Sequence, residues 1–291
     1  ALWLYWAACL GGDMDLRITV LSENTATYGF LAEWGLCLLV EVDGMMVMMD
    51  TGLGTAAIHN AQLLGVDLTR VDKIVISHGH ADHTGGLREM LRRKRGPVEV
   101  IAHPSIWESK YTRRPNERER YAGIPFPREE LESLGARFTL TTQPVELAPG
   151  VWTTGEVSQE VAYEDVAPDL YLKQGDTWVK DPLRDDLALV LKTPRGLVVV
   201  PGCAHRGIVN TLHQARRVAG DEPIYAVLGG THLFRASAQR IEQTVADLLP
   251  WGIQHLGVCH CTGFRACARL ADALGDVFFM NNAGNRWRPD K

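Results

Sequence analysis

Basic residues are not in excess in this 291-residue sequence. Its 30 Lys and Arg residues are outnumbered by 35 Asp and Glu residues, which gives a formal net charge of -5 at pH 7. Nucleic-acid-binding proteins need a basic surface, so this balance argues against a nucleic-acid partner. Two local basic clusters, within 88–95 and 113–120, are either solvated surface or an attraction for an anionic substrate.

Cysteine is scarce, and no Cys-x-x-Cys pair occurs. Six cysteines in so long a chain do not form a disulfide scaffold, and such usage fits a reducing cytoplasm. The apolar stretch at residues 1–10 is too short to span a bilayer and lacks the basic start of a signal peptide. We therefore expect a cytoplasmic protein with no membrane partner, in which residues 1–13 are an extension and 14–291 form one domain.

The sequence does have the composition of a globular protein, with 46% hydrophobic and 22% charged residues. Periodicity and turn residues predict strands at 16–21, 35–42, 45–49, 73–77, 97–102, 137–141, 151–154, 187–192, 197–200, 224–228, 252–258 and 277–280, and helices at 55–64, 87–95, 129–134, 207–218, 236–249 and 263–274. Each half begins with strands and ends with alternating strands and helices. This order predicts an α/β protein with four layers, an αββα sandwich. Residues 107–127 show no period and predict an inserted loop or lid.

One short segment carries several possible metal ligands, His78-Gly79-His80-Ala81-Asp82-His83. If the chain is extended at its start, His78 and His80 point the same way and can share one metal ion. Asp82 and His83 lie where the chain turns toward a helix, so they can face a second ion. Imidazoles with one carboxylate suit zinc or another first-row divalent ion. The alternative is a polar loop whose histidines only form hydrogen bonds.

A pair of metal ions at this loop has a clear chemical use. Two ions can produce hydroxide from water at neutral pH, polarise an ester or phosphoryl oxygen and stabilise the leaving group. The glycines at 85 and 86 make the following helix N-terminus approachable for an anion. The loop therefore predicts a metal-activated hydroxide that attacks an ester, phosphoester or lactone, with Asp82 or a nearby aspartate orienting it.

The segment from Ser77 to Leu87 resembles the signature of the metallo-β-lactamase superfamily, and Asp50-Thr51-Gly52 resembles its first motif. Motifs beginning at Pro201, Leu228 and His260 resemble the branch named for 7,8-dihydropterin-6-methyl-4-(β-D-ribofuranosyl)-aminobenzene-5'-phosphate synthase. The resemblance covers the chain from about Leu16 to its end. It implies the αββα fold, a small-molecule substrate and two divalent metal ions, with zinc ahead of manganese or iron.

The resemblance also implies a set of metal ligands, with one departure. The superfamily's usual Gly-Asp, which supplies a bridging carboxylate, is replaced by Gly202-Cys203, and no histidine occurs within 181–186 before the strand at 187–192. We expect His205 to compensate; the alternative is Cys203 as a thiolate. The expected ligands are His78, His80, Asp82, His83, His205 and His260. His232 follows a Gly-Gly turn and is expected to contact substrate or shuttle a proton, unless local backbone satisfies it.

These residues are compatible with three functions. A dinuclear metal-dependent hydrolase, acting on a substrate that is anionic or phosphorylated, comes first. The branch name implies a condensation between a pterin and a ribosyl-aminobenzene phosphate as an alternative. A metal-binding sensor without turnover is the third, and fold alone does not choose among them. The sequence leaves open whether the protein is a homo-oligomer.

Overall fold

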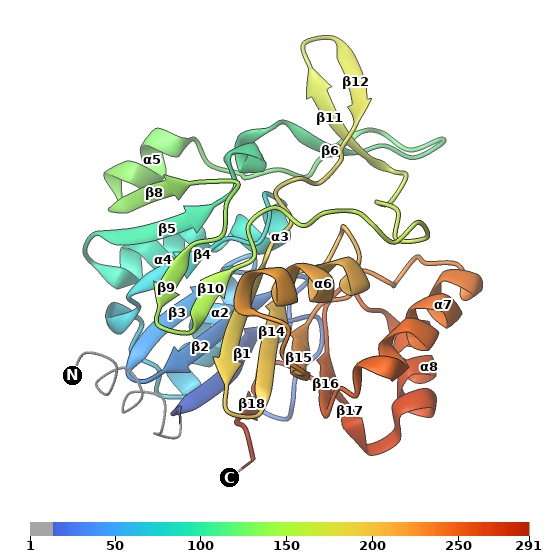
Figure 1. Ribbon diagram of the computed structural model, residues 1–291. Coiled ribbons are helices and arrows are strands. Elements are labelled where there is room, and N and C mark those ends of the chain that lie inside the picture. Colours follow the sequence, from blue (N-terminus) through green and yellow to red (C-terminus); the bar gives the residue numbers. More distant parts are fainter. Residues whose placement is uncertain (1–13, 291) are drawn as a thin grey trace, which may run out of the picture.

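The computed structural model describes residues 14–290, and the expected extension at 1–13 lies outside this range. Two seven-stranded sheets form the centre of the molecule (Figure 1). In each sheet, strands that pair antiparallel on one side are followed by strands that pair parallel on the other. The parallel half of each sheet aligns several carboxyl ends at one edge, where ligands bind in open α/β sheets.

The first sheet has the strand order β18-β1-β2-β3-β4-β5-β8. Its members are β18 (Arg286–Trp287), β1 (Leu16–Ser22), β2 (Cys37–Val42), β3 (Met45–Met49), β4 (Lys73–Val75), β5 (Val98–Ala102) and β8 (Ala136–Leu140). Asp43 and Gly44, both with positive φ, form the tight turn between β2 and β3. The strand β4, in which Ile74 and Val75 are buried, leads directly into the histidine loop.

The second sheet has the order β17-β16-β15-β14-β13-β10-β9. Its members are β17 (Phe278–Met280), β16 (His255–Val258), β15 (Ile224–Gly229), β14 (Gly196–Pro201), β13 (Ala188–Thr193), β10 (Val151–Thr153) and β9 (Glu146–Ala148). All six residues of β14 and all six of β15 are buried, as expected for strands covered on both faces.

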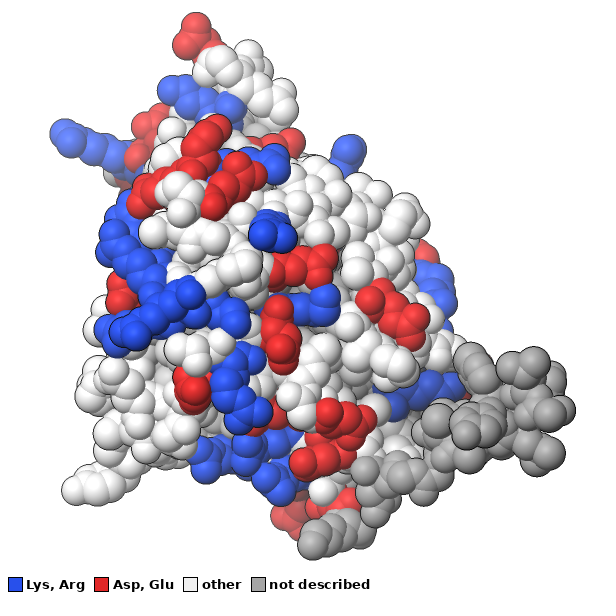
Figure 2. All heavy atoms as spheres, turned by 90° about the vertical axis from the view of Figure 1, so that its left-hand side faces the viewer, with Lys and Arg blue, Asp and Glu red and all other residues white. Residues whose placement is uncertain are grey.

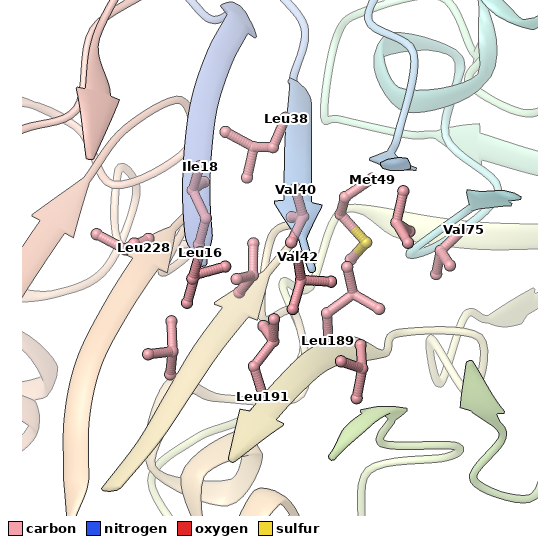
Figure 3. Packing of buried hydrophobic residues seen from close by; sticks show 14 of the residues in the cluster. Leu16, Ile18, Leu38, Val40, Val42, Met49, Val75, Leu189, Leu191 and Leu228 are labelled. Atoms are coloured by element: carbon pink, nitrogen blue, oxygen red, sulfur yellow. The ribbon is translucent and has the colours of Figure 1, made fainter. Parts of the chain in front are cut away.

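The main core lies between the two sheets. Leu16, Ile18 and Val40 of the first sheet point toward Leu189 and Leu191 of the second (Figure 3). These side chains are almost fully buried, so removing their apolar surface from water is a main source of stability. Because residues at alternate strand positions face this core, the opposite faces of both sheets remain to be covered by helices.

The helices cover those outer faces. The first sheet packs against α2 (Thr55–Leu63), α4 (Leu87–Lys94) and α5 (Arg128–Ser133), and the second against α6 (Ile208–Ala219), α7 (Ala238–Leu248) and α8 (Phe264–Leu274). The short helices are α3 (Ala81–Thr84), η1 (Leu68–Arg70), η2 (Pro104–Trp107), η3 (Leu249–Trp251) and η4 (Gly275–Val277). The resulting helix-sheet-sheet-helix arrangement confirms the predicted four-layer αββα sandwich.

A third, four-stranded sheet was not predicted. It has the order β12-β11-β6-β7 and is formed by β6 (Lys110–Thr112), β7 (Arg120–Tyr121), β11 (Leu170–Gln174) and β12 (Thr177–Lys180). Figure 1 shows β6, β11 and β12 beyond one end of the sandwich. The prediction of 107–127 as an irregular loop was therefore incomplete, because strands of two or three polar residues leave no alternating pattern.

The predicted basic cluster within 88–95 lies largely on α4. Arg88 pairs with Glu130 of α5, and Arg93 pairs with Glu89 one helical turn away. On the side of the molecule shown in Figure 2, basic and acidic side chains are interspersed. This cluster is therefore largely a solvated, ion-paired surface. Among residues 14–290, no helix has both the length and the apolar character needed to cross a membrane.

Candidate metal centre

The predicted ligands are brought together at the carboxyl ends of parallel strands. Asp50 follows β3, the histidine loop follows β4, and His205 lies four residues beyond β14. His232 and His260 follow β15 and β16 in the same way. The edge that joins these ends therefore collects side chains from segments more than 200 residues apart in the sequence.

Three histidines form the first group. His78 Nε2 lies 3.0 Å from His80 Nδ1 and 3.1 Å from His205 Nε2. All three side chains are buried. The structure brings His78 and His80 together, as expected for residues that could share one position, and it places His205 beside them.

Asp82, His83 and His260 form the second group. His83 Nε2 lies 3.2 Å from His260 Nε2, and an oxygen of Asp82 lies 3.5 Å from the same atom of His260. The indole N–H of Trp34 donates to Asp82 at 3.0 Å. Each group places its possible ligand atoms within 4.8 Å of one another, a spacing that fits a metal ion. The structure thus brings all six predicted ligands together as two adjacent groups.

The hydrogen bonds around three of the histidines decide which ring nitrogen faces inward. Ser77 Oγ donates to Asp50 at 2.7 Å and is 2.9 Å from His78 Nδ1, so it accepts the proton there. His83 Nδ1 donates to Asp50 Oδ2 at 2.6 Å, and His260 Nδ1 donates to Asn24 Oδ1 at 2.9 Å. Each of these histidines therefore turns Nε2 toward the centre, as metal-bound histidines do.

The pKa values follow from burial and from Asp50. Burial, followed by neighbouring positive charge, lowers the pKa of His80 to about 4 and that of His205 well below its usual value. Burial also disfavours the charged form of His83, but Asp50 outweighs it and raises the pKa of His83 to about 9. The hydrogen bond from His260 and the charge of His83 lower the pKa of Asp82, although burial alone would raise it. The centre thus offers neutral imidazoles at His80 and His205 and an ionised carboxylate at Asp82, whereas His83 keeps a proton that a bound metal ion would displace.

These observations test whether the residues fit divalent metal ions. Uncharged ring nitrogens that face one another at about 3 Å repel unless a proton or a cation lies between them. Imidazole nitrogens with a carboxylate are the donors that zinc and similar ions take, and their outer nitrogens are already held by oxygen acceptors. The donor set therefore fits two divalent ions.

Strained backbone marks the same edge of the sheets. Asp50, Ala204, His232 and His260 all have left-handed φ values, of 60°, 53°, 47° and 53°. Such angles cost energy in residues other than glycine, and they cluster where surrounding structure holds functional side chains in place. Gly79 serves the loop differently, because a side chain there would place its Cβ 2.5 Å from the carbonyl oxygen of Ile106.

A buried ion-pair cluster beneath the histidine loop was not predicted. The ammonium of Lys110, on β6, donates to Asp181 at 3.0 Å and to Asp185 at 2.9 Å, and all three side chains are buried. Asp185 also accepts the backbone N–H of Gly79 at 2.7 Å. The segment 181–186, which has no histidine, thus supports the ligand loop through a carboxylate. No motif indicated that Lys110 would reach it.

A cavity of 350 Å³ opens onto both groups of ligands. It is lined by His80, His205, His232, Asp82, His260, by the aromatic side chains of Trp34, Tyr121 and Phe234, and by Arg114, Arg120 and Arg235. The ring centroids of His232 and His205 are 3.9 Å apart. His232 therefore lies beside the ligands and lines the cavity, as a substrate contact would, and its backbone N–H donates to Cys261.

Two further acidic side chains, Asp186 and Glu156, do not line the cavity. Asp186 is buried and accepts the backbone N–H of Arg206 at 2.9 Å, which supports the turn that carries His205. Glu156 lies 3.7 Å from His103. Cys203 is placed differently, because its sulfur lies 3.1 Å from His83 Nε2, inside the centre. His205 and Cys203, considered as alternatives, are therefore both present at the site.

Comparison with known proteins agrees with this geometry. A family model described as the metallo-beta-lactamase superfamily matches residues 35–216, more than half of the chain. This chain belongs to the metallo-beta-lactamase superfamily. Members of the superfamily typically bind divalent metals, and the described chain has the clustered donors to do so.

Within the superfamily, a similar relative is 7,8-dihydropterin-6-methyl-4-(beta-D-ribofuranosyl)-aminobenzene-5'-phosphate synthase of Methanocaldococcus jannaschii. It is 32% identical over 94% of this chain and 97% of its own length. The crystal structure of Tm1679, described as a metal-dependent hydrolase of the beta-lactamase superfamily, has a TM-score of 0.81 and 30% identity over 95% of this chain and 100% of its own. Zn(2+)-bound PqqB from Methylobacterium extorquens, with a TM-score of 0.55 and 11% identity over 94% of this chain and 100% of its own, shares the fold.

These relatives confirm the predicted superfamily and branch. The predicted branch is named for this synthase activity, and the synthase aligns with nearly the whole chain. They do not distinguish hydrolysis from condensation, because one name is that of a synthase and the other that of a hydrolase.

Proposed function

We propose that this protein is a dinuclear metal-dependent hydrolase that cleaves a phosphoester bond in a small phosphorylated molecule with a planar ring. The main support for the proposal is that both ligand groups face one cavity and that three arginines line this cavity. The groups are His78, His80 and His205, and Asp82, His83 and His260. Zinc is the metal we favour, because nitrogen and carboxylate donors around a small centre suit it.

The ions and the side chains have separate tasks. Two bound divalent ions would make water a strong nucleophile near neutral pH and would polarise the phosphoryl oxygen under attack. Asp82, held by the Trp34 indole, is placed to accept a hydrogen bond from the attacking water and so to orient it. Burial, followed by nearby charges, lowers the pKa of His232 to about 3, so its neutral ring can donate a hydrogen bond to substrate.

The cavity wall supports an anionic substrate. Arg114 and Arg235 both contact Asp169, at 2.8 and 3.3 Å, and this shared carboxylate holds the two guanidinium groups together. Arg120 makes no ion pair within residues 14–290, so its charge remains available. Arginine is well suited to phosphate because its planar donors can form two parallel hydrogen bonds.

Aromatic side chains on the same wall support a flat organic group. The rings of Trp34 and Phe234 are 5.8 Å apart in an edge-to-face arrangement, and about half of the Trp34 surface is exposed. Together with Tyr121 across the cavity, they offer apolar surface to a planar ring. A ring bearing a phosphate group would match both the aromatic and the basic parts of the wall.

The test combines metal content with turnover. We expect the zinc- or manganese-loaded protein to hydrolyse bis-p-nitrophenyl phosphate faster than p-nitrophenyl acetate or a lactone. His80→Ala should lose metal, measured by elemental analysis, and at least about 100-fold in kcat/KM, because one metal position loses a ligand. His59→Ala, on the exposed face of α2, is the matched control and should change neither. A fully loaded protein that is silent on the whole panel would contradict hydrolysis and favour a sensor.

One observation favours a second candidate. The Methanocaldococcus jannaschii synthase is similar over nearly the full length of both chains. In that reaction class, the amine of ribosylaminobenzene phosphate would form a nitrogen–carbon bond to the 6-methyl carbon of a dihydropterin. The bond from that carbon to its leaving group would break, and the amine would lose a proton. The arginines and aromatic rings of the cavity suit this phosphate and this pterin equally well.

A competition experiment separates the two functions. The metal-loaded protein is incubated with 6-hydroxymethyl-7,8-dihydropterin diphosphate, with and without ribosylaminobenzene 5'-phosphate, and the products are identified by mass spectrometry. Hydrolysis predicts 6-hydroxymethyl-dihydropterin at a rate that does not depend on the amine. A joined product that forms only when both compounds are present would establish the synthase instead.

A further inference from the structure

Cys203 lies between the two groups of ligands. Its sulfur is within 4.8 Å of the ligand nitrogens of His78 and His83, and it is likewise grouped with His260 and Cys261. The side chain is buried, and its sulfur lies 3.1 Å from His83 Nε2. Among the described residues, Cys203 shares this position with His83, which is also grouped both with His78 and with His260.

The chain at the end of β14 is tightly constrained in this position. A Cβ at Gly202 would lie 2.1 Å from Ser77 Oγ, so glycine allows the strand end to approach the histidine loop. Ala204 then turns the chain through a left-handed conformation, with φ of 53°. Cys203 is thus held against the centre by the close approach of the chain at Gly202 and by the left-handed turn at Ala204, a backbone conformation that costs energy in a residue other than glycine.

The neighbouring thiols are occupied differently. Cys261 accepts the backbone N–H of His232 at 3.2 Å, and its own S–H is directed at the carbonyl of Cys203 at 3.5 Å. Cys259 packs in the core between the two sheets. Cys203 has no such backbone contact from its sulfur among residues 14–290; its hydrogen-bond partners are the inward nitrogen of His83 and the thiol of Cys261.

We propose that Cys203, as a thiolate, is a ligand shared by the two metal positions and takes the place of the carboxylate that the superfamily usually has there. The inference rests on the metal centre of the proposed function. A thiolate donates to soft and borderline metals, whereas a carboxylate suits magnesium, calcium and manganese. Cys203 therefore makes this centre selective for zinc, cobalt or iron over manganese, and its thiol proton passes to solvent when metal binds.

Cobalt substitution tests the ligand directly, without an activity assay. Cobalt(II) added to the metal-free protein should give visible d–d bands and a near-ultraviolet sulfur-to-cobalt charge-transfer band. Cys203→Ser should lose the charge-transfer band while the d–d bands persist. Cys261→Ser and Cys259→Ser are matched controls, because they remove thiols on either side of His260 and should keep the band.

The outcomes separate this inference from the proposed function. Cobalt d–d bands without any charge-transfer band, or loss of that band in Cys261→Ser and not in Cys203→Ser, would overturn the role of Cys203 and leave the metal centre standing. A wild-type protein that binds no cobalt, zinc or iron would overturn both. Cys203→Asp adds a second measurement: competition between zinc and manganese should shift toward manganese relative to wild type, and an unchanged preference would contradict the proposal.

Discussion

At the residue scale, Lys110 shows how a buried charge outside the ligand set can support the site. Its ammonium is buried between Asp181 and Asp185. Asp185 also accepts a hydrogen bond from the backbone N–H of Gly79 and so holds the histidine loop in place. Burial opposes the charged forms of all three groups. The mutual contacts outweigh burial for Lys110, whose pKa is raised, and for Asp185, whose pKa is lowered. The cluster therefore carries charge inside the protein.

Replacing Lys110 by Met should destabilise the protein strongly. The substitution leaves two buried carboxylates without their cation, and breaking a buried ion pair in this way costs about 3–5 kcal/mol. Urea unfolding measures the loss. Lys173→Met, on the exposed part of the same small sheet, is the control and should change the free energy of unfolding by no more than about 0.5 kcal/mol. Equal stability of the two variants would contradict the structural role given to Lys110.

The sequence predicted the ligands and the motif that contains Asp50, but it missed other residues that support the ligands, for a physical reason. His78, His80, Asp82 and His83 lie within six residues, so local spacing alone indicates that they can converge. Asn24 and His260, in contrast, are 236 residues apart, and Lys110 and Asp185 are 75 apart. Such partners meet only because the sheets fold around them. The sequence could not decide between His205 and Cys203 for the same reason, because the positions of both side chains depend on how the chain folds after the end of β14.

At the element scale, the third sheet brings a part of the chain that has no clear sequence pattern to the wall of the cavity. Arg120 and Tyr121 lie on β7, which has two residues and pairs only with β6. Tyr111 of β6 contacts Tyr121 and Trp178 edge-to-face, with ring centroids 5.3 and 5.1 Å apart. Because so short a strand has few hydrogen bonds, the contact between Tyr111 and Tyr121 is a main support for β7, and the contact with Trp178 of β12 holds Tyr111 in place.

Tyr111→Ala should therefore loosen the cavity wall without disturbing the metal centre. Each aromatic pair contributes about 0.5–1.5 kcal/mol beyond the burial of its surface, and the variant removes two pairs. We expect faster amide hydrogen exchange in β6 and β7 and a higher KM for a phosphorylated substrate, with metal content unchanged. Tyr111→Phe keeps both ring contacts and should behave as wild type. A rise in KM of the same size in both variants would show that the hydroxyl, and not the packing, matters.

At the scale of the whole molecule, the two sheets were predictable because their patterns are strong. Buried runs such as 197–200 and 224–228, separated by helices with apolar faces, leave few arrangements other than stacked sheets with helices outside. The small sheet had no comparable signal, since β6 and β7 are short and polar and are completed by a hairpin some 50 residues later. Strong hydrophobic periodicity thus identified the scaffold, whereas the small sheet that lines the cavity was not predicted.

The same architecture makes metal binding a property of the entire fold. The two ligand groups combine loops from both sheets, so a bound ion joins segments that separate when the protein unfolds. An ion present at 100 times its dissociation constant stabilises the folded state by about 2.7 kcal/mol for each site. In a chain of this size, removal of the ions by a chelator should lower Tm by roughly 5–10 °C per site.

Differential scanning calorimetry measures this fall, and readdition of zinc should reverse it. His260→Ala should show a smaller response to chelator than wild type, because one ligand group loses a member that links the last strand region to the histidine loop. His59→Ala should respond as wild type does. An identical Tm before and after complete chelation would mean that the ions do not join the two sheets, and the ligand assignment that follows from their convergence would then be wrong.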